Sequence, residues 1–374
     1  MYKHTHRIAW FALALALVVI VFGAFVRLSD AGLSCPDWPT CYGRATWPTQ
    51  EAHFAHAEQN FARPVESHKA WREQVHRHLA ALLGVGVLAL ALLAARRRRF
   101  GIATILGASL MVAVAIPLYM QGQHVAASVL AALAEVLLLL AAWRWSNQDL
   151  SRVATLLLAV IIFQALLGMW TVTWLLKPVV VMAHLLGGLA TFSLLAFLAW
   201  RATPDAPLVH SDAPRLRGLL GIGLVLLVVQ IALGGWTSAN YAALACGTDF
   251  PTCLGQWWPA ADWREGFVLW RGIGVDYEGG VLDGEARVAI QMAHRLMAVV
   301  VFGHLLAVAL RLWRTTGLRH WGVTLGVLLI AQVALGISNV HFGLPLAVAV
   351  AHNAGAVLLL FVLVTLLTRL RVPS

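Results

Sequence analysis

The run AWFALALALVVIVFGAFV at residues 9–26 is long enough to cross about 30 Å of bilayer hydrocarbon as one α-helix. It is longer than the apolar core of a signal peptide and has no small-residue cleavage site before Arg27, so we expect a retained first span. Further apolar runs follow at about 79–95, 103–120, 126–143, 153–175, 179–200, 218–237, 288–312, 322–340 and 346–368. The sequence therefore predicts an all-α polytopic membrane protein with about ten transmembrane helices.

Composition and charge agree with this fold class. Of the 374 residues, 60% are hydrophobic and 12% are charged, roughly half the charged fraction of a soluble domain. With ten spans, the basic groups near both termini and in alternate turns all fall on one side, which the positive-inside rule makes cytoplasmic. The main groups are Lys3 and Arg7, Arg96 to Arg99, Arg144 and Arg152, Arg201, Arg215 and Arg217, Arg311, Arg314 and Arg319, and Arg369 and Arg371. The net charge of +10 is thus a topology signal, and we expect membrane lipid and no nucleic acid as a partner.

All four cysteines lie in two similar loops, CPDWPTCYG at 35–43 and CGTDFPTCLG at 246–255. The topology puts both loops outside, which in a bacterial inner membrane means the periplasm, where disulfides persist. We expect the pairs Cys35–Cys41 and Cys246–Cys253, each closing a small loop worth roughly 2 kcal/mol. Either the pairs only staple the loops, or one of them handles electrons or thiols. A zinc site is disfavoured because the paired histidine spacing of a zinc module is absent.

The loops belong to a longer internal repeat. FGAFVRLSDAGLSC (22–35) aligns with LGGWTSANYAALAC (233–246), and EQVHRHLA (73–80) aligns with QMAHRLMA (291–298). QALLGMWTV (164–172) aligns with QVALGISNV (332–340), and MAHLLGG (182–188) with VAHNAGA (350–356). Each half therefore has the same four-helix pattern in the same membrane orientation, a parallel repeat.

The helices expected at about 101–121 and 125–143 have no counterpart in the second half. We therefore expect two tandem four-helix units with an inserted helical hairpin at about 101–144. The first unit, with the insertion, covers 1–205, and the second covers 206–374.

Four of the fifteen histidines follow the repeat. His76 and His294 lie at equivalent places near the outer end of one helix, and His184 and His352 at equivalent places on another. Ionisable residues within membrane spans are expensive and usually functional. Two imidazoles at one depth on separate helices suit a haem whose axial ligands approach iron from opposite faces. We therefore expect one bis-His site in each half.

Charged residues flank the first histidine of each pair. Arg77 and Arg295 follow it directly and are candidates for contact with haem propionates, or for interface arginines. Glu73 precedes His76 by one turn on the same face, whereas Gln291 stands at the equivalent place in the second half. This asymmetry predicts a chemical role for the first site and electron transfer for the second, unless Glu73 only pairs with a nearby arginine.

The chain resembles the haem A synthases of cytochrome oxidase assembly, in the form with a cysteine pair in both large outer loops. The resemblance rests on GAFVRLSDAGLSCPDWPTC, the ExxHR at 73–77, QALLGMWTV with His184, HR at 294–295 and His352. The inserted hairpin near 101–144 departs from the usual eight-helix member.

The resemblance implies oxidation of the C8 methyl of the substrate haem O to the formyl of haem A. It assigns His76 and His184 to the substrate haem iron, with Glu73 as the catalytic carboxylate. His294 and His352 would ligate a permanent haem b. Haem O synthase or other assembly factors are the expected protein partners, and homo-oligomerisation stays open.

Other functions stay open at this stage. A di-haem cytochrome b that passes electrons would need the four histidines but not the Glu73 asymmetry. A quinone-linked thiol oxidase would use the cysteines but gives no reason for the histidine pattern. A transporter would place polar groups near the midplane of broken helices, whereas here they lie at outer ends.

Overall fold

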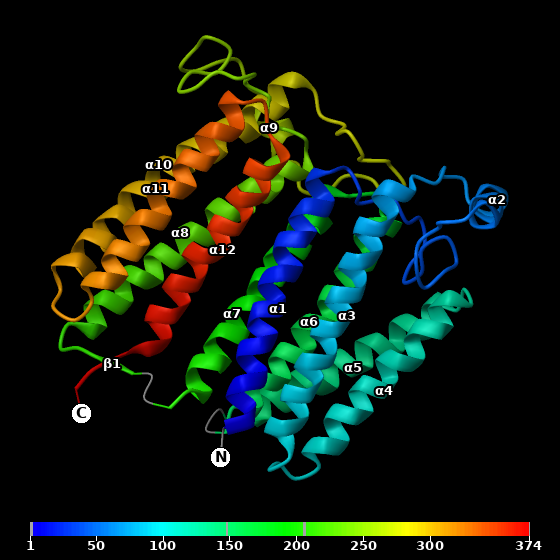
Figure 1. Ribbon diagram of the computed structural model, residues 1–374, viewed down its shortest axis with the longest axis horizontal. Helices are drawn as coiled ribbons and strands as arrows, with labels where there is room; N and C mark the ends of the chain where they lie inside the picture. Colours follow the sequence, from blue (N-terminus) through cyan, green and yellow to red (C-terminus); the bar gives the residue numbers. More distant parts are fainter. Residues whose placement is uncertain (1–2, 147–148, 205–206, 374) are drawn as a thin grey trace. The chain divides into compact units, whose positions relative to one another are not determined.

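The computed structural model describes residues 3–146, 149–204 and 207–373, and almost all of its regular structure is helical (Figure 1). Within those residues ten helices are long and apolar enough to cross a membrane, which confirms the predicted spans. These ten are α1 (Lys3–Leu28), α3 (Ser67–Ala95), α4 (Gly101–Met120), α5 (His124–Arg144), α6 (Ser151–Thr173), α7 (Pro178–Ala202), α8 (Ala213–Ala239), α10 (Gly284–Arg314), α11 (Arg319–His341) and α12 (Leu346–Arg369). The chain is thus a multi-pass membrane protein.

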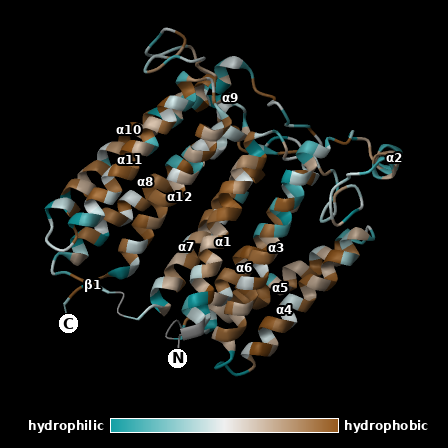
Figure 2. Cartoon of the chain, viewed as in Figure 1, coloured by the Kyte–Doolittle hydropathy of each residue, from teal (hydrophilic) through white to brown (hydrophobic). Residues whose placement is uncertain are grey.

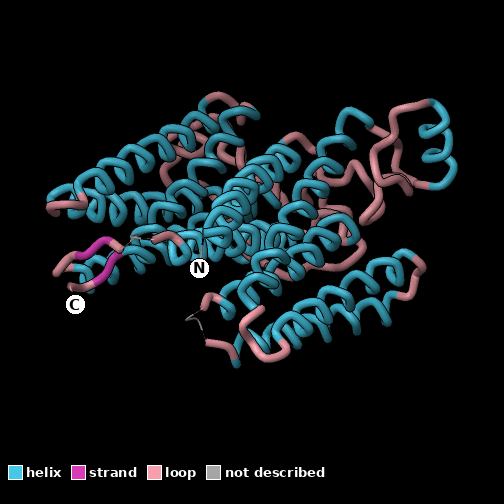
Figure 3. The backbone as a smooth tube through the Cα atoms, turned by 60° about the horizontal axis from the view of Figure 1, so that its bottom comes forward, coloured by secondary structure: helices cyan, strands magenta, loops and turns pink. Residues whose placement is uncertain are grey.

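Polar residues gather at the ends of these helices and in the connections, as Figure 2 shows by hydropathy. Two short helices, α2 (Glu51–Asn60) and α9 (Trp263–Gly266), lie in the connections that follow the cysteine loops. The strands β1 (Leu208–Val209) and β2 (Leu370–Arg371) pair in parallel, with Leu208 opposite Leu370, close to the C-terminus (Figure 3).

The chain divides into two compact units that each combine separate stretches. The first contains Met1–Val19, Cys35–Met169 and Gly187–Ala206, and the second contains Ile20–Ser34, Trp170–Leu186 and Pro207–Ser374. The division crosses α1, α6 and α7. The predicted boundary between the two halves, at residues 205–206, lies outside the described residues.

The inserted hairpin is part of the first unit. Helix α4 packs against α3 and α5, so the hairpin lies beside the α3 helix of the repeat. At the end of the hairpin away from its turn, Arg98 donates to the Asp149 carboxylate and the Ser151 hydroxyl, at 2.8 and 2.9 Å. At the other end the ring of Tyr119 lies 6.0 Å from that of Trp38 in the first cysteine loop. The hairpin turn and that loop therefore lie at the same end of the unit.

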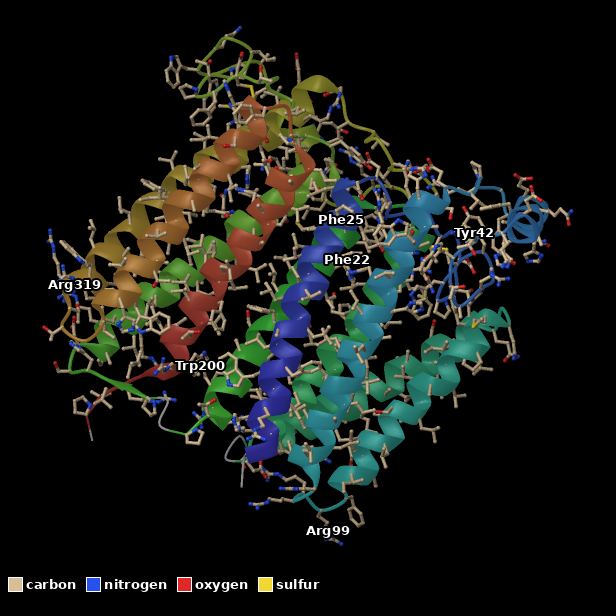
Figure 4. The ribbon with its side chains drawn as sticks, in the orientation of Figure 1. Phe22, Phe25, Tyr42, Arg99, Trp200 and Arg319 are labelled. Atoms are coloured by element: carbon tan, nitrogen blue, oxygen red, sulfur yellow. A yellow bond between two sulfur atoms is a disulfide. The ribbon has the colours of Figure 1, made fainter. Side chains whose placement is uncertain are left out.

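Basic turns and cysteine loops occupy opposite ends of the same helices. In the first unit, Tyr42 of the cysteine loop lies near the start of α3, and Arg99 lies in the turn after it (Figure 4). In the second unit, Arg319 begins α11 directly after the turn that follows α10, away from the end that carries the second cysteine loop (Figure 4). Basic turns at one end of the helices and long loops at the other are the pattern that the positive-inside rule describes for multi-pass membrane proteins.

Candidate functional site

The first cysteine loop is closed by the predicted disulfide between Cys35 and Cys41. The Asp37 carboxylate accepts hydrogen bonds from the backbone N–H groups of Tyr42, at 2.6 Å, and Gly43, at 2.9 Å. Gly43 has a φ of 73°, a left-handed conformation that glycine adopts without strain. The carboxylate thus fixes the turn that follows the second cysteine.

Tyr42 packs this loop onto the connection that leads to α3. Its side chain is 1% exposed, its hydroxyl donates to the Pro64 carbonyl at 2.9 Å, and its ring meets Phe61 edge-on. Burial, the largest influence, raises the pKa of Tyr42 to about 12, and nearby carboxylates, including Asp37, act in the same direction. Tyr42 is therefore a neutral, buried anchor at ordinary pH.

Arg77 ties the same loop to α3, directly after His76. One nitrogen of its guanidinium donates to the carbonyls of Asp37 and Thr40, at 2.7 and 2.6 Å. The other donates to the Cys35 carbonyl at 3.2 Å. A side chain on α3 thus holds three carbonyls of the disulfide loop, so the loop and the helix position that carries His76 are mechanically joined.

The second cysteine loop uses the same contacts. The Cys246–Cys253 disulfide is formed, and Arg295 donates to the carbonyls of Asp249 and Thr252, both at 2.9 Å. The Asp249 carboxylate accepts from the Gly255 N–H at 2.8 Å, as Asp37 does from Gly43 in the first loop. Both disulfide predictions are confirmed. The predicted contact of Arg77 and Arg295 with propionates stays a prediction, and in the structure both guanidinium groups donate to carbonyls of their disulfide loops.

Glu73 is the point at which the two halves differ most. Its side chain is 6% exposed, pairs with Arg77 at 2.5 Å and accepts a hydrogen bond from the Cys35 N–H at 2.8 Å. The equivalent residue Gln291 is also buried but brings no charge. A fixed carboxylate therefore lies one turn before His76, joined to the disulfide loop, and no such charge precedes His294.

The second pair of predicted ligands lies within one bundle. His294 is on α10 and His352 is on α12, and both are partly buried. Helices α8 and α11 each pack against both α10 and α12, so the helices that carry the two histidines are diagonal partners (Figure 1). Two imidazoles on diagonal helices can approach one planar ligand from opposite faces, which fits the predicted bis-His haem.

Glutamine and glycine residues position these two rings. The amide nitrogen of Gln230, on α8, lies 3.1 Å from Nδ1 of His294, and Nδ1 of His352 lies 3.1 Å from the Gln332 carbonyl oxygen. A Cβ added at Gly234 would come within 3.1 Å of the His294 ring, and one at Gly336 equally close to the His352 ring. An added methyl group at either position would therefore crowd the imidazole, and glycine lets the neighbouring helix pass close to each histidine.

The first pair of predicted ligands is divided between the units. His76, on α3, belongs to the first unit, and His184, on α7, belongs to the second, and both are partly buried. Three residues after His184, Gly187 faces Gln164, whose amide nitrogen would lie only 1.7 Å from an added Cβ. Gly355 faces Gln332 in the same way in the second half.

Sequence reasoning missed several of these residues. Gln164 and Gln332 begin two aligned motifs, and Asp37 and Asp249 occupy aligned places in the two loops, so the repeat could have identified them. Lys177 was also missed. It is 1% exposed and stands directly before α7, where the repeat has Pro345 instead.

The comparisons with known proteins cover almost the entire chain. The family model described as cytochrome oxidase assembly protein (COX15-CtaA) matches residues 6–123 and 122–364, which meet at the turn of the inserted hairpin. A haem A synthase of Shewanella oneidensis is 40% identical over 95% of this chain and 93% of its own length. One of Rhizorhabdus wittichii is 28% identical over 94% of this chain and 90% of its own, and one of Paracoccus denitrificans is 34% identical over 46% and 44%. As its sequence predicted, the chain belongs to the cytochrome oxidase assembly protein family that contains the haem A synthases.

Proposed function

We propose that this protein is a haem A synthase, an enzyme that oxidises the C8 methyl group of haem O to a formyl group. The observation that carries the proposal is the 40% identity to a haem A synthase over 95% of the chain. The family match, over 6–123 and 122–364, includes the positions of Glu73 and all four repeat histidines.

We assign His294 and His352 to the iron of a resident haem b. Their place on diagonal helices, each against a glycine and a glutamine, supports the assignment. Haem b, when bound, supplies a redox-active iron. We assign His76 and His184 to the iron of the substrate haem O. They hold the corresponding places in the first half of the repeat, and the Glu73 carboxylate lies one turn before His76.

We propose Glu73 as the catalytic carboxylate of the substrate half. Conversion of a methyl to a formyl group is a four-electron oxidation, met by two hydroxylations and the loss of one water. With water as the oxygen source and an external electron acceptor, each hydroxylation releases two electrons and two protons, and the hydroxylated substrate must be held until the next step. A carboxylate fixed by Arg77 and the Cys35 N–H, one turn from His76, can accept a proton at one oxygen or orient that hydroxyl.

We propose that the main role of Arg77 and Arg295 is to hold each disulfide loop beside the histidine pair of its half. Both also stay candidates for contact with haem propionates. The disulfides Cys35–Cys41 and Cys246–Cys253 are then mainly structural. The two loops share the same arginine and aspartate contacts, which supports equivalent roles in the two halves.

We propose that residues 1–205 and 206–374 are the two tandem halves, in a bacterial inner membrane with both termini cytoplasmic and the cysteine loops periplasmic. The basic turns at the ends opposite the cysteine loops support this orientation (Figure 4). Haem O must then be delivered within the membrane, and a haem O synthase or an assembly factor is the expected donor.

The test is haem extraction and chromatography from a host that makes haem O but no haem A. Wild type, Glu73→Ala, His294→Ala and the matched control Gln291→Ala are expressed to equal levels, verified by immunoblot. We expect haem A from wild type and the control, and haem O or a hydroxylated haem accumulating in Glu73→Ala. Haem b alone, with haem O unchanged by well-folded wild type, would identify an electron-transfer cytochrome instead.

A further inference from the structure

A buried lysine without a hydrogen-bond acceptor lies between α6 and α7. Lys177 is 1% exposed, and within the described residues its Nζ has no hydrogen-bond partner. The ammonium lies 3.4 Å from the ring centroid of Trp270 and 5.6 Å from that of Trp174. Its contacts are therefore aromatic faces, which attract a cation but neutralise none of its charge.

The local fold fixes the lysine in this place. Leu175 and Leu176 both adopt left-handed φ angles, 49° and 57°, and turn the chain sharply before α7. The carbonyl of Lys177 then accepts the N–H groups of Val180 and Val181, at 2.9 and 3.1 Å, so the residue begins the helix.

A segment from the second outer loop covers it. The Tyr277 N–H donates to the Leu175 carbonyl at 3.1 Å, and the buried Tyr277 ring packs against Leu176. Trp270 belongs to the same segment. It is 61% exposed, yet its ring lies over Lys177, so one aromatic side chain separates the ammonium from the outside.

Burial of an ammonium without a counter-ion is unfavourable, and aromatic contacts offset only part of that penalty. Desolvation by burial lowers the pKa of Lys177, as expected for a cation without an anionic neighbour. Such a group is better explained by an anion that joins it when a ligand binds than by a role in packing. The place is also specific to the first half, because the repeat has Pro345 there.

The anion can be inferred from His184, which lies further along the same helix. His184 follows Lys177 by seven residues, about two turns or roughly 10 Å, so both lie on one side of α7. A porphyrin bound through iron to His184 carries two propionate carboxylates at its edge, and the outer end of the helix is where charged groups can stay near water. The only charges on that substrate edge are these carboxylates.

We propose that Lys177 binds a propionate carboxylate of the porphyrin substrate held at His184, beneath the ring of Trp270. The inference rests on the proposed function, since it takes haem O as the molecule at His184. The lysine would then bind and orient the substrate in the first half. The second half has Pro345 at the equivalent place and therefore would hold its haem without such a lysine.

The test is an optical titration of purified protein, already loaded at the second site, with haem O and with its propionate dimethyl ester. Wild type, Lys177→Met and Lys177→Arg are compared with the control Lys69→Met. Lys69 lies seven residues before His76, but its ammonium is already paired with Glu66 at 3.0 Å. Haem A formation by wild type is measured in parallel.

We expect Lys177→Met to weaken haem O binding about 10- to 100-fold, the value of one charge-assisted hydrogen bond, and to leave ester binding unchanged. Lys177→Arg and the control should bind haem O nearly as wild type does. Before haem O is added, Lys177→Met should melt at or above the wild-type temperature, because an unpaired buried charge has been removed.

Equal binding of haem O by wild type and Lys177→Met overturns the proposal, as does equal weakening for acid and ester or an equal loss in the control. If wild type does bind haem O and makes haem A, such a result leaves the proposed function standing. If wild type neither binds haem O nor makes haem A, the proposed function fails and this inference fails with it.

Discussion

Replacing Arg77 by Gln should release the first disulfide loop much more than any equivalent change releases the second. The guanidinium donates to three loop carbonyls, of Cys35, Asp37 and Thr40, and pairs with Glu73. Removal of the arginine leaves these carbonyls without their donor. It also removes the Arg77 guanidinium from a carboxylate whose side chain is 6% exposed and to which the Cys35 N–H donates.

The magnitude follows from the burial of this ion pair. Loss of one partner from a buried pair costs about 3–5 kcal/mol, because the other charge stays buried. At 1.4 kcal/mol per factor of ten, the open form of the loop should become at least about 100-fold more populated. Arg295→Gln removes carbonyl contacts but leaves no carboxylate, so we expect about 1.5–3 kcal/mol, or about 10- to 100-fold.

The assay is the rate at which dithiothreitol reduces each disulfide in detergent-solubilised protein. New thiols are blocked at set times and assigned by mass spectrometry of the loop peptides, which reports Cys35–Cys41 and Cys246–Cys253 separately. Arg77→Gln should accelerate reduction of the first disulfide and leave the second unchanged, and Arg295→Gln should do the reverse with a smaller factor.

The double variant Glu73→Gln/Arg77→Gln separates the ion pair from the carbonyl contacts. Because the carboxylate that lost the Arg77 guanidinium is also removed, the first disulfide of the double variant should be reduced more slowly than that of Arg77→Gln, at a rate increase near that of Arg295→Gln. The reasoning is refuted if the first disulfide of Arg77→Gln is reduced as slowly as in wild type. It is also refuted if adding Glu73→Gln does not slow the reduction.

Three further changes have defined outcomes. Cys41→Ser should lower stability by roughly 2 kcal/mol by loop-closure entropy yet keep haem A formation at normal protein levels, and lost activity in well-folded protein would indicate a redox role. Because the pKa of Tyr42 is raised from 10.0 to about 12, the stability that this residue contributes is complete below pH 10 and is lost as the pH rises through 12. Tyr42→Phe should therefore lose less thermal stability at alkaline pH than wild type does. Parallel curves of melting temperature against pH for the two proteins would contradict this. Gly336→Ala puts a methyl group 3.1 Å from the His352 ring and should weaken haem b binding about tenfold in a spectral titration, whereas Gly326→Ala on the same helix, with its nearest neighbour at 3.9 Å, should not; equal affinities would refute the close fit.

Much of the architecture could be predicted because it depends on short stretches of chain. Each apolar run determines its own helix, since the bilayer offers no other hydrogen-bond partners to its backbone. The two cysteine pairs are also local, with a few residues between partners, so their disulfides could be expected from spacing. The repeat assigned the four histidines and Glu73 to particular helices near one end of each.

The contacts that such residues make with distant segments of the chain could not be predicted in the same way. Arg77 was a candidate for propionate contact, but in the structure it holds loop carbonyls that lie about forty residues earlier, and Arg295 does the same. Either role suits an arginine at the end of a membrane helix, and the loop contacts could not be predicted because they depend on the path of the loop. Trp270 likewise reaches Lys177 from a different half of the sequence.

The sequence by itself therefore determined the membrane class, the ten spans with the α4–α5 hairpin among them, the disulfide pairs and the family. These depend on hydropathy, length and short spacings, which the solvent and the local chain impose. Tertiary structure alone decided that Glu73 is joined to the first disulfide loop, that α10 and α12 are diagonal, and that Lys177 is buried with no counter-ion among the residues that the structure describes. Each of those facts is a contact between segments distant in sequence, and such contacts arise only when the helices pack and the loops fold over their ends.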